Sequence, residues 1–331
     1  MKKIKLFIVS ILIILNSATL IADDFNDWKV KFKKRAINEG ISKSTVNNLI
    51  DKTKFLPDVI KYDRYQPEFY EDTKTYISKR TSSKKVKLGK IILNKENNII
   101  NKVSSEYKVD NNLLLALMGI ETNFGNYLGK MDIISSLATL SFDQRRSEFF
   151  TKELITLLKL VDAKIIDPST LFGSWAGAFG NFQFMPSTIK NHAIDYNKDG
   201  SIDLKNIEDS FASAANYLSN LGWNDNTPCF YRINLNENIP DKYLNTSAKK
   251  IKHERKVKYL KNYIKNSSFL DKYDNLTAAI VTPDAEIVEN ANKLKPAYII
   301  FNNYKLILKW NRSLRFSLAV CTLKNSFENE T

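Results

Sequence analysis

Histidine and cysteine are scarce in this 331-residue chain, which contains two of each. Neither His192 nor His253 lies in a zinc signature or beside a nucleophile motif. Cys229 and Cys321 belong to no metal-ligand cluster, although an even count is compatible with one disulfide in an oxidising compartment. The sequence therefore gives little support to zinc chemistry or to a histidine-activated nucleophile.

Glycine and proline are also few, with ten and eight residues. This excludes a linker-rich or low-complexity protein, and the chain has neither a phosphate-cradling glycine loop nor a repeat at a fixed period. With 43% hydrophobic residues the chain can bury a substantial core. Its length predicts two domains, or one domain with insertions.

Acidic residues are outnumbered, and the formal net charge is +14. Such a charge attracts anionic partners, but the lysines are spread along the chain among Asn and Ile, which is typical of a compositional bias. The densest basic stretch is residues 249–258. We therefore expect no nucleic-acid partner, and a general attraction to an acidic envelope polymer.

The apolar run at the start of the chain is short and covers residues 6–15, interrupted only by Ser10. Lysines precede this run and small residues follow it up to Ala22. That order predicts a secretory signal peptide over 1–22 and a periplasmic location. An uncleaved anchor is the alternative, and no cysteine stands there to carry a lipid.

The remaining pattern predicts a mainly helical protein. Residues 27–100 follow helical spacing, and further helices are expected after Asp110, over 146–161, from Pro186, over 210–221 and over 312–323. Short strands are expected over 230–235, 276–281, 297–301 and 304–308, the last two joined by a tight turn at Asn302-Asn303. The fold class is therefore α+β, mainly α, with a small β-containing insertion.

Glu121 is the first candidate for catalysis. On a helix it shares one face with Leu113, Leu114, Leu117 and Met118. Loss of hydration on an apolar face raises the pKa of a carboxyl group, which keeps a proton available to a general acid. From periodicity alone, a solvent-facing glutamate at a helix end is the better interpretation.

A second motif, DYNKDGSID at 195–203, resembles the calcium-binding loop of an EF-hand. Oxygen ligands alternate around a glycine at the sixth position. Asn206 replaces the usual glutamate at position twelve, and Asp209 is available to supply the missing carboxylate. An Asx-rich turn without metal is the alternative.

A third motif is the loop over 173–188, GSWAGAFGNFQFMPST, where small residues alternate with aromatic ones. Trp175, Phe179, Phe182 and Phe184 suit a groove wall that stacks on sugar rings, and Ser174 and Gln183 are suitable hydrogen-bonding groups. Alone, such a loop is more often a packing connection between helices.

Five blocks, in matching order and spacing, resemble the membrane-bound lytic transglycosylase B family. They are ALMGIETNFG at 116–125, SLATLSFDQRRSEFF at 136–150, GSWAGAFGNFQFMPS at 173–187, DYNKDGSIDL at 195–204 and ANYLSNLGW at 215–223. The resemblance runs from about residue 60 to the C-terminus and favours Glu121 as catalytic. One departure is Trp310-Asn311, where the family often has a tyrosine before the asparagine.

The resemblance implies a lysozyme-like core and a specific set of site residues. Glu121 matches the catalytic acid; glycan-groove positions match Tyr76, Arg145, Arg146, Ser174, Gln183, Tyr217 and Asn311. A structural calcium ion, with no organic cofactor, would be held by Asp195, Asn197, Asp199, Ser201 (through its carbonyl) and Asp209. The expected domains are a signal peptide 1–22, a helical region 23–104, a catalytic core 105–228, a small β-containing domain 229–309 and a C-terminal helix 310–331.

The implied reaction is non-hydrolytic cleavage of the β-1,4 bond between N-acetylmuramic acid and N-acetylglucosamine. Most glycosidases use two carboxylates, whereas this sequence offers one strong candidate. One carboxylate fits a reaction in which the substrate itself supplies part of the catalysis. A hydrolytic muramidase and a non-catalytic peptidoglycan-binding scaffold are the alternatives. The expected partners are peptidoglycan glycan strands, with an association with the outer envelope left open and a monomer expected.

Overall fold

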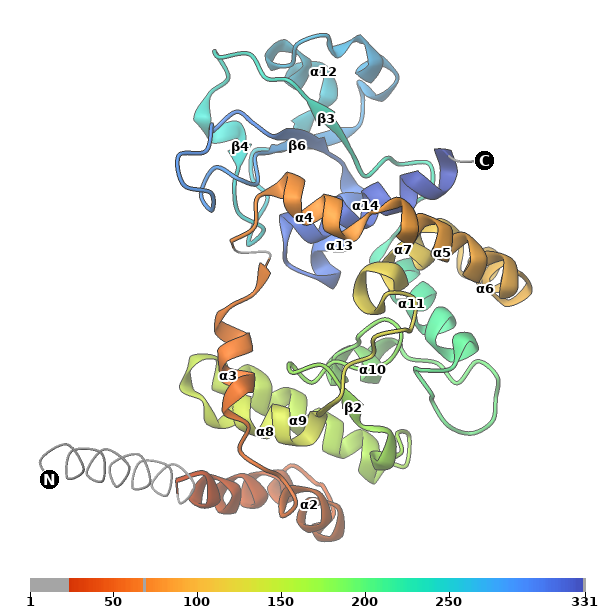
Figure 1. Cartoon of the computed structure of the whole chain (residues 1–331), viewed down its shortest axis with the longest axis vertical. Helices are drawn as coiled ribbons and strands as arrows, with labels where there is room; N and C mark the ends of the chain where they lie inside the picture. Colours follow the sequence, from red (N-terminus) through yellow and green to blue (C-terminus); the bar gives the residue numbers. More distant parts are fainter. Residues whose placement is uncertain (1–23, 68–69, 330–331) are drawn as a thin grey trace, which may run out of the picture. The chain divides into compact units, whose positions relative to one another are not determined.

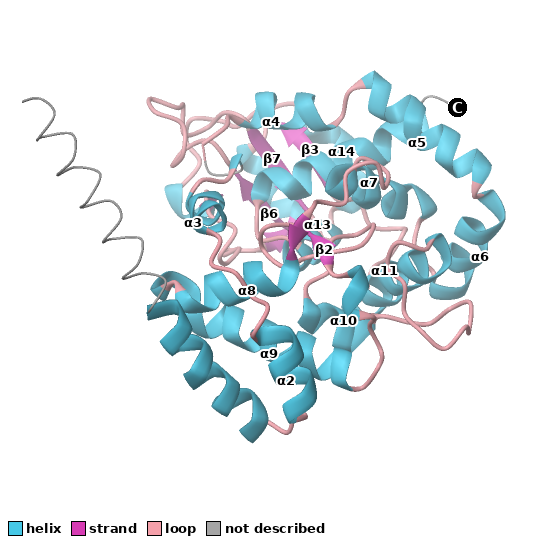
Figure 2. Ribbon diagram, turned by 60° about the horizontal axis from the view of Figure 1, so that its bottom comes forward, coloured by secondary structure: helices cyan, strands magenta, loops and turns pink. Residues whose placement is uncertain are grey.

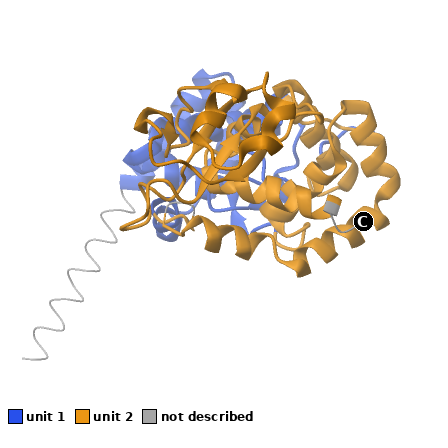
Figure 3. Ribbon diagram, turned by 90° about the horizontal axis from the view of Figure 1, so that it is seen from above, with its two compact units in different colours: residues 1–64, 128–191, 198–203 blue, residues 65–127, 192–197, 204–331 orange. Residues whose placement is uncertain are grey.

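The chain divides into two compact units (Figure 3). Unit 1 comprises residues 1–64, 128–191 and 198–203, and unit 2 comprises 65–127, 192–197 and 204–331. The computed structural model describes residues 24–67 and 70–329, so the predicted signal peptide over 1–22 lies outside the described residues. Within the described part, no helix is long and apolar enough to cross a membrane.

Unit 1 is a helical body with one small antiparallel strand pair. Residues 24–38 are helical. The other helices are α2 (Lys43–Ile50), α3 (Pro57–Arg64), α8 (Ile133–Phe142), α9 (Ser147–Asp162) and α10 (Pro186–His192), whose last residue belongs to unit 2. The strands are β1 (Met131–Asp132) and β2 (Phe172–Gly173). Residues 133–141 of α8 are all buried, and α8 packs against α9.

Unit 2 is built around helix α7 (Asn111–Thr122). Residues 113–119 of α7 are all buried, which requires neighbours on every side of the helix. These neighbours are α5 (Ser83–Lys95), α6 (Asn97–Tyr107), α11 (Ile207–Leu221) and α14 (Leu314–Asn329). Helix α14 also packs against α4 (Thr73–Arg80) and α13 (Asn302–Trp310) (Figure 1).

The larger sheet belongs to unit 2 and has the strand order β3-β7-β6-β4, with β5 paired to β6. Its strands are β3 (Phe230–Ile233), β4 (Leu244–Asn245), β5 (Arg255–Lys256), β6 (Thr277–Val281) and β7 (Ala297–Ile300). Side chains alternate between its two faces. Ile280 and Ile299 join one hydrophobic cluster with residues of 257–270, whereas Val281 and Ile300 join a second with α13 and α14.

Helices predominate over strands (Figure 2), so the predicted mainly helical fold with a small β-containing part is confirmed. The helix predicted after Asp110 is α7, and the helix predicted over 210–221 is α11, which ends at Gly222 with a φ of 89°. Cys229 and Cys321 form a disulfide, which resolves the pairing that the sequence left open.

The strand and turn predicted over 302–308 are wrong, because these residues form helix α13. Tyr304, Ile307 and Leu308 lie on its buried face at i, i+3 and i+4 spacing. The side-chain amide of Asn303 donates to the carbonyl oxygens of Asn224 and Thr227, both at 2.7 Å, which fixes the start of the helix. Between β5 and β6, the short helix α12 (Val257–Leu260) is followed by the 3-10 turn η5 (Lys261–Tyr263).

Candidate active site

Glu121 lies in the last turn of α7, where it is half-buried. Asp110 caps the start of the helix, and its carboxylate accepts a hydrogen bond of 2.7 Å from the backbone N–H of Asn112. The residues of α7 are buried from Leu113 to Gly119, and Thr122 is buried as well. The side chain of Glu121 is thus carried by a rigid, internally packed helix rather than by a loop.

The chain turns sharply directly after this helix. Asn123, Phe124 and Gly125 have consecutive positive φ angles of 50°, 60° and 78°. Each left-handed non-glycine residue costs roughly 1–3 kcal/mol, and such strain concentrates at functional sites. The turn is held by hydrogen bonds from Phe124 N to Met118 O at 3.2 Å and from Gly125 N to Thr122 Oγ1 at 3.0 Å.

A tryptophan from α13 contacts the Glu121 carboxyl group. The indole Nε1–H of Trp310 donates to Glu121 Oε1 at 3.1 Å. The Trp310 ring stacks on Tyr217 with centroids 5.2 Å apart, and Tyr217 stacks on His192 at 4.4 Å. Burial raises the pKa of Tyr217 and lowers the pKa of His192, which favours the uncharged form of both rings.

Two more predicted groove residues belong to unit 2. Tyr76 of α4 is 3% exposed, and the guanidinium carbon of Arg80 lies 3.5 Å from its ring centroid. Asn311 caps the C-terminal end of α13 through its backbone N–H, which donates to Ile307 O at 3.0 Å, and it directly follows Trp310. Within this unit, the structure therefore links Glu121 to Tyr217 through Trp310, with Asn311 adjacent in the chain.

Ser174 and Gln183 lie in one loop of unit 1. The Ser174 hydroxyl accepts from the backbone N–H of Ala178 at 3.0 Å. Gln183 has a left-handed backbone, and its side-chain amide donates to Gly180 O at 2.9 Å and to Leu128 O at 3.3 Å. Both side chains therefore have local partners that hold them in a defined orientation.

The aromatic residues of the same loop do not all form a groove wall. Phe179, Phe182 and Phe184 are between 2% and 4% exposed, so the interpretation that they stack on sugar rings is wrong. Their apolar surface contributes to the hydrophobic core. Trp175 is half-buried.

Arg145 and Arg146 converge on one carboxylate in unit 1. Arg145 Nε donates to Asp63 Oδ2 at 2.7 Å, and Arg146 Nη2 forms an ion pair with Asp63 Oδ1. The Asp63 side chain is 1% exposed, whereas those of Arg145 and Arg146 are 43% and 39% exposed. The buried carboxylate fixes the two guanidinium groups and leaves part of each accessible.

The expected calcium ligands lie on two stretches of chain. In unit 2, Asp209 is fully buried and its Oδ1 accepts from the backbone N–H groups of Tyr196 at 2.8 Å and Asn197 at 3.3 Å. In unit 1, Asp199 accepts from the backbone and hydroxyl of Ser201, both at 2.9 Å. Across residues 24–67 and 70–329, no group of three or more His, Cys, Asp or Glu side chains is gathered around a metal position.

Sequence reasoning missed Trp310 as a partner of Glu121, and Asp63 as the partner of the two arginines. Trp310 is 189 residues from Glu121, and Asp63 is 82 from Arg145. Such long separations leave no periodic signal. A local clue existed for Trp310 alone, because it stands directly before the predicted site residue Asn311.

Comparison with known families gives the decisive match. The family model described as a transglycosylase SLT domain matches residues 24–325. The chain belongs to this family. Membrane-bound lytic murein transglycosylase B of Escherichia coli (strain K12) is 38% identical over 149 residues, which cover 45% of this chain and 41% of that relative. The match thus spans about two fifths of the length of the curated relative.

Solved structures match over nearly the whole chain. SltB3 from Pseudomonas aeruginosa, in complex with NAG-NAM-pentapeptide, is 29% identical with a TM-score of 0.80, over 92% of this chain and 80% of that chain. The Escherichia coli lytic transglycosylase Slt35, in complex with calcium, is 25% identical with a TM-score of 0.74, over 91% and 92%. These similarities confirm the predicted lysozyme-like fold class and the predicted family.

Proposed function

We propose that the protein is a lytic transglycosylase that cleaves peptidoglycan glycan strands at the bond between N-acetylmuramic acid and N-acetylglucosamine. The observation that carries this proposal is Glu121, set at the end of the buried helix α7 and hydrogen-bonded to Trp310. The family match supports it, as does the complex of Pseudomonas aeruginosa SltB3 with NAG-anhNAM-pentapeptide, at 29% identity and a TM-score of 0.79.

The proposed reaction uses Glu121 first as an acid and then as a base. The protonated carboxyl group gives its proton to the glycosidic oxygen while the bond from this oxygen to the anomeric carbon breaks. The acetamido group of the muramic residue stabilises the developing positive charge. The carboxylate then removes the proton of the muramic 6-hydroxyl, whose oxygen bonds to the anomeric carbon. Glu121 ends protonated, and the product has a 1,6-anhydromuramoyl end.

Glu121→Gln tests this assignment, because glutamine keeps the shape of the side chain but supplies no acidic proton. We expect the release of anhydromuropeptides from purified sacculi, measured by mass spectrometry, to fall by at least about 1,000-fold. Glu237→Gln, at an exposed position, is the matched control and should retain wild-type release. Near-normal activity of Glu121→Gln would refute the assignment.

The product distinguishes the alternatives. Reducing ends, one water heavier than anhydro ends, would make the protein a hydrolytic muramidase. Binding to sacculi without any release, by the wild type as well as by Glu121→Gln, would make it a peptidoglycan-binding scaffold.

We propose in addition that the 195–209 segment binds a structural calcium ion. The expected ligands Asp195, Asn197, Asp199, Ser201 and Asp209 supply only hard oxygen atoms, which calcium prefers. Slt35 in complex with calcium supports this assignment by analogy. The two backbone N–H groups that bind Asp209 keep its carboxylate beside the start of the loop, within unit 2.

Calcium binding predicts a melting temperature that depends on the ion. Binding to the native state alone stabilises it by about 2.7 kcal/mol at 100 times the dissociation constant. We expect EGTA to lower the melting temperature by several degrees, calcium to restore it, and Asp195→Asn to weaken the response. An identical melting temperature in EGTA and in calcium would exclude the site.

We propose a periplasmic location for the protein, acting as a monomer on the murein layer. The support is the order of lysines, apolar residues and small residues over 1–22. Fractionation of cells that produce the full chain tests the location, and recovery in the cytoplasm would refute it.

A further inference from the structure

We propose that Trp310 is a positioning residue that determines which oxygen of Glu121 carries the catalytic proton. This inference rests on the proposed function and adds a specific role for a residue of α13. It starts from one contact, the hydrogen bond of 3.1 Å from Trp310 Nε1 to Glu121 Oε1.

The indole group makes this contact directional. Its N–H is a donor and has no lone pair that could accept a proton in return. Glu121 Oε1 must therefore be the acceptor in both protonation states of the carboxyl group. In the protonated group the carbonyl oxygen is the better acceptor, so the contact with Trp310 favours Oε1 as the carbonyl oxygen and Oε2 as the oxygen that carries the proton. A tyrosine hydroxyl in the same position can donate or accept, so it would keep a donor beside Oε1 but fix the position of the proton less strictly.

The orientation of the indole is itself fixed by its surroundings in unit 2. One ring face stacks on Tyr217, whose hydroxyl donates to the carbonyl of Lys309 at 3.4 Å, directly before Trp310. The ring of His192 also stacks on Tyr217, with centroids 4.4 Å apart. The turn after α13 is held by the buried Tyr304, whose hydroxyl donates to Leu314 O at 2.7 Å. Trp310 is thus held by its helix, its stack and the following turn.

This arrangement divides the reaction between the two carboxyl oxygens. Oε2 gives its proton to the glycosidic oxygen as the glycosidic bond breaks. The negative charge left on the carboxylate is stabilised by the N–H of Trp310 at Oε1, so Oε2 is the oxygen that accepts the proton of the muramic 6-hydroxyl. The proton count balances, and Trp310 neither gains nor loses a proton.

The first experiment tests the N–H donor of Trp310 separately from the packing of its ring. Trp310→Phe keeps an aromatic ring that can stack on Tyr217 but removes the donor. A hydrogen bond to a charged group contributes enough to lower kcat by roughly 10- to 100-fold when it is lost. We expect that fall in kcat on defined glycan strands, with KM changed less than about twofold. Trp310→Tyr, which can still donate, should recover a substantial part of kcat.

A shape-matched variant and an unrelated tryptophan complete the test. Replacing Trp310 with 3-benzothienylalanine keeps the bicyclic ring and exchanges N–H for sulfur, so it separates the donor from packing even if Trp310→Phe folds poorly. Trp28→Phe is the control, since Trp28 stacks on Phe25 and Phe32. It should keep wild-type kcat.

The outcomes distinguish this inference from the proposed function. A raised KM at unchanged kcat would make Trp310 a sugar-stacking residue, and an unchanged kcat in the benzothienyl variant would overturn the positioning role. Either result leaves the function standing if Glu121→Gln is inactive. If the wild type releases no anhydro ends, the proposed function fails instead.

Discussion

At the scale of single residues, the position of Glu121 depends on a glycine two residues before it. A Cβ atom built on Gly119 would lie 2.7 Å from Cζ of Phe124 and 3.2 Å from Cδ2 of Leu323. Only a residue without a side chain lets the Phe124 ring fold back against the helix and lets α14 approach it. The left-handed turn over 123–125 thus packs against Gly119 of α7 through the Phe124 ring.

Gly119→Ala tests this close approach. The added methyl group favours the helix by about 1 kcal/mol but overpacks the Phe124 contact by roughly 1–3 kcal/mol. We expect a small net change in stability, and a kcat at least about tenfold lower because the turn after Glu121 is displaced. Muropeptide release and thermal melting measure the two effects.

Gly40→Ala is the matched control. A Cβ atom added at Gly40 would have nothing within 4 Å of it, but the φ of this residue is 91°. Backbone strain should therefore reduce its stability by about 1 kcal/mol while kcat is retained. Full activity of Gly119→Ala would show that the turn tolerates displacement.

Some residues of the candidate site could be predicted from the sequence, and others could not. Helical spacing makes Glu121 a candidate but by itself favours a solvent-facing glutamate, and the five-block resemblance is what favours a catalytic role. Trp310 and Asp63 were missed because each contacts its partner across a long sequence separation, which tertiary packing alone determines. Phe182 was misassigned, since an aromatic residue in a loop has the same sequence pattern whether it faces a ligand or the core.

At the scale of elements, a buried ion pair joins three parts of unit 2. Asp284, in the segment after β6, forms a hydrogen bond of 2.7 Å with Arg315 of α14. It also accepts from the backbone N–H of Thr73 at 3.0 Å, at the start of α4. The side chains of Arg315 and Asp284 are 2% and 10% exposed. One carboxylate thus holds the β-containing part, α4 and α14 together.

Asp284→Ala should destabilise the fold strongly. It leaves the Arg315 charge buried without its carboxylate, which typically costs about 3–5 kcal/mol. We expect the urea midpoint to fall accordingly. Asp241→Ala is the control, because Asp241 and Lys293 form an ion pair whose side chains are 73% and 63% exposed, worth about 1 kcal/mol at most. Equal midpoints for the two variants would contradict the role of the buried pair.

Helices were predicted correctly where the sequence carries a clear capping or stop signal. Helix α7 has a cap at Asp110, and α11 has a glycine stop, so both could be located from the sequence. Helix α13 was mistaken for a strand because a short apolar run fits both periods. Its helical form depends on the sheet and α14, because Tyr304 and Leu308 of α13 join one hydrophobic cluster with strand residues and with Leu314 of α14.

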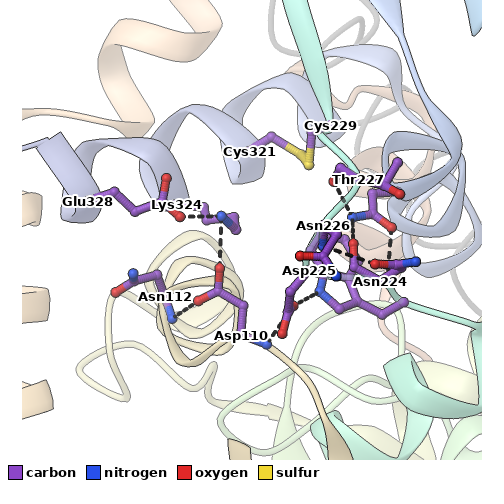
Figure 4. A network of polar contacts seen from close by, with 12 residues as sticks. Asp110, Asn112, Asn224, Asp225, Asn226, Thr227, Cys229, Cys321, Lys324 and Glu328 are labelled. Atoms are coloured by element: carbon purple, nitrogen blue, oxygen red, sulfur yellow. Dashed lines mark hydrogen bonds and ion pairs between the residues drawn. A yellow bond between two sulfur atoms is a disulfide. The ribbon is translucent and has the colours of Figure 1, made fainter. Parts of the chain in front are cut away.

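At the scale of the whole molecule, covalent and ionic links connect the sheet, α7 and α14 (Figure 4). The disulfide joins Cys229, just before β3, to Cys321 of α14. One turn further along α14, Lys324 forms ion pairs with Asp110 at the start of α7 and with Glu328. Asp110 N in turn donates to Asp225 at 3.2 Å. The helix that carries Glu121 is therefore supported by α14.

Reducing this disulfide should lower the stability of the folded protein markedly. The bond closes a loop with a sequence separation of 92 residues. A loop of that size contributes about 4–5 kcal/mol on the loop-entropy model, chiefly by restricting the unfolded chain. We expect a reductant to lower the melting temperature of the wild type by several degrees, and Cys229→Ser/Cys321→Ser to melt at the reduced value in either condition.

The double variant is also the control for the reductant, since it contains no other cysteine. Because the Lys324 ion pairs and the packing of α14 on α7 remain, the variant should keep most of its kcat below its melting temperature. A wild-type melting curve that does not respond to reductant would show that the bond is absent in solution. A loss of kcat in the folded variant would show instead that the disulfide holds α14, and with it Glu121, in the active arrangement.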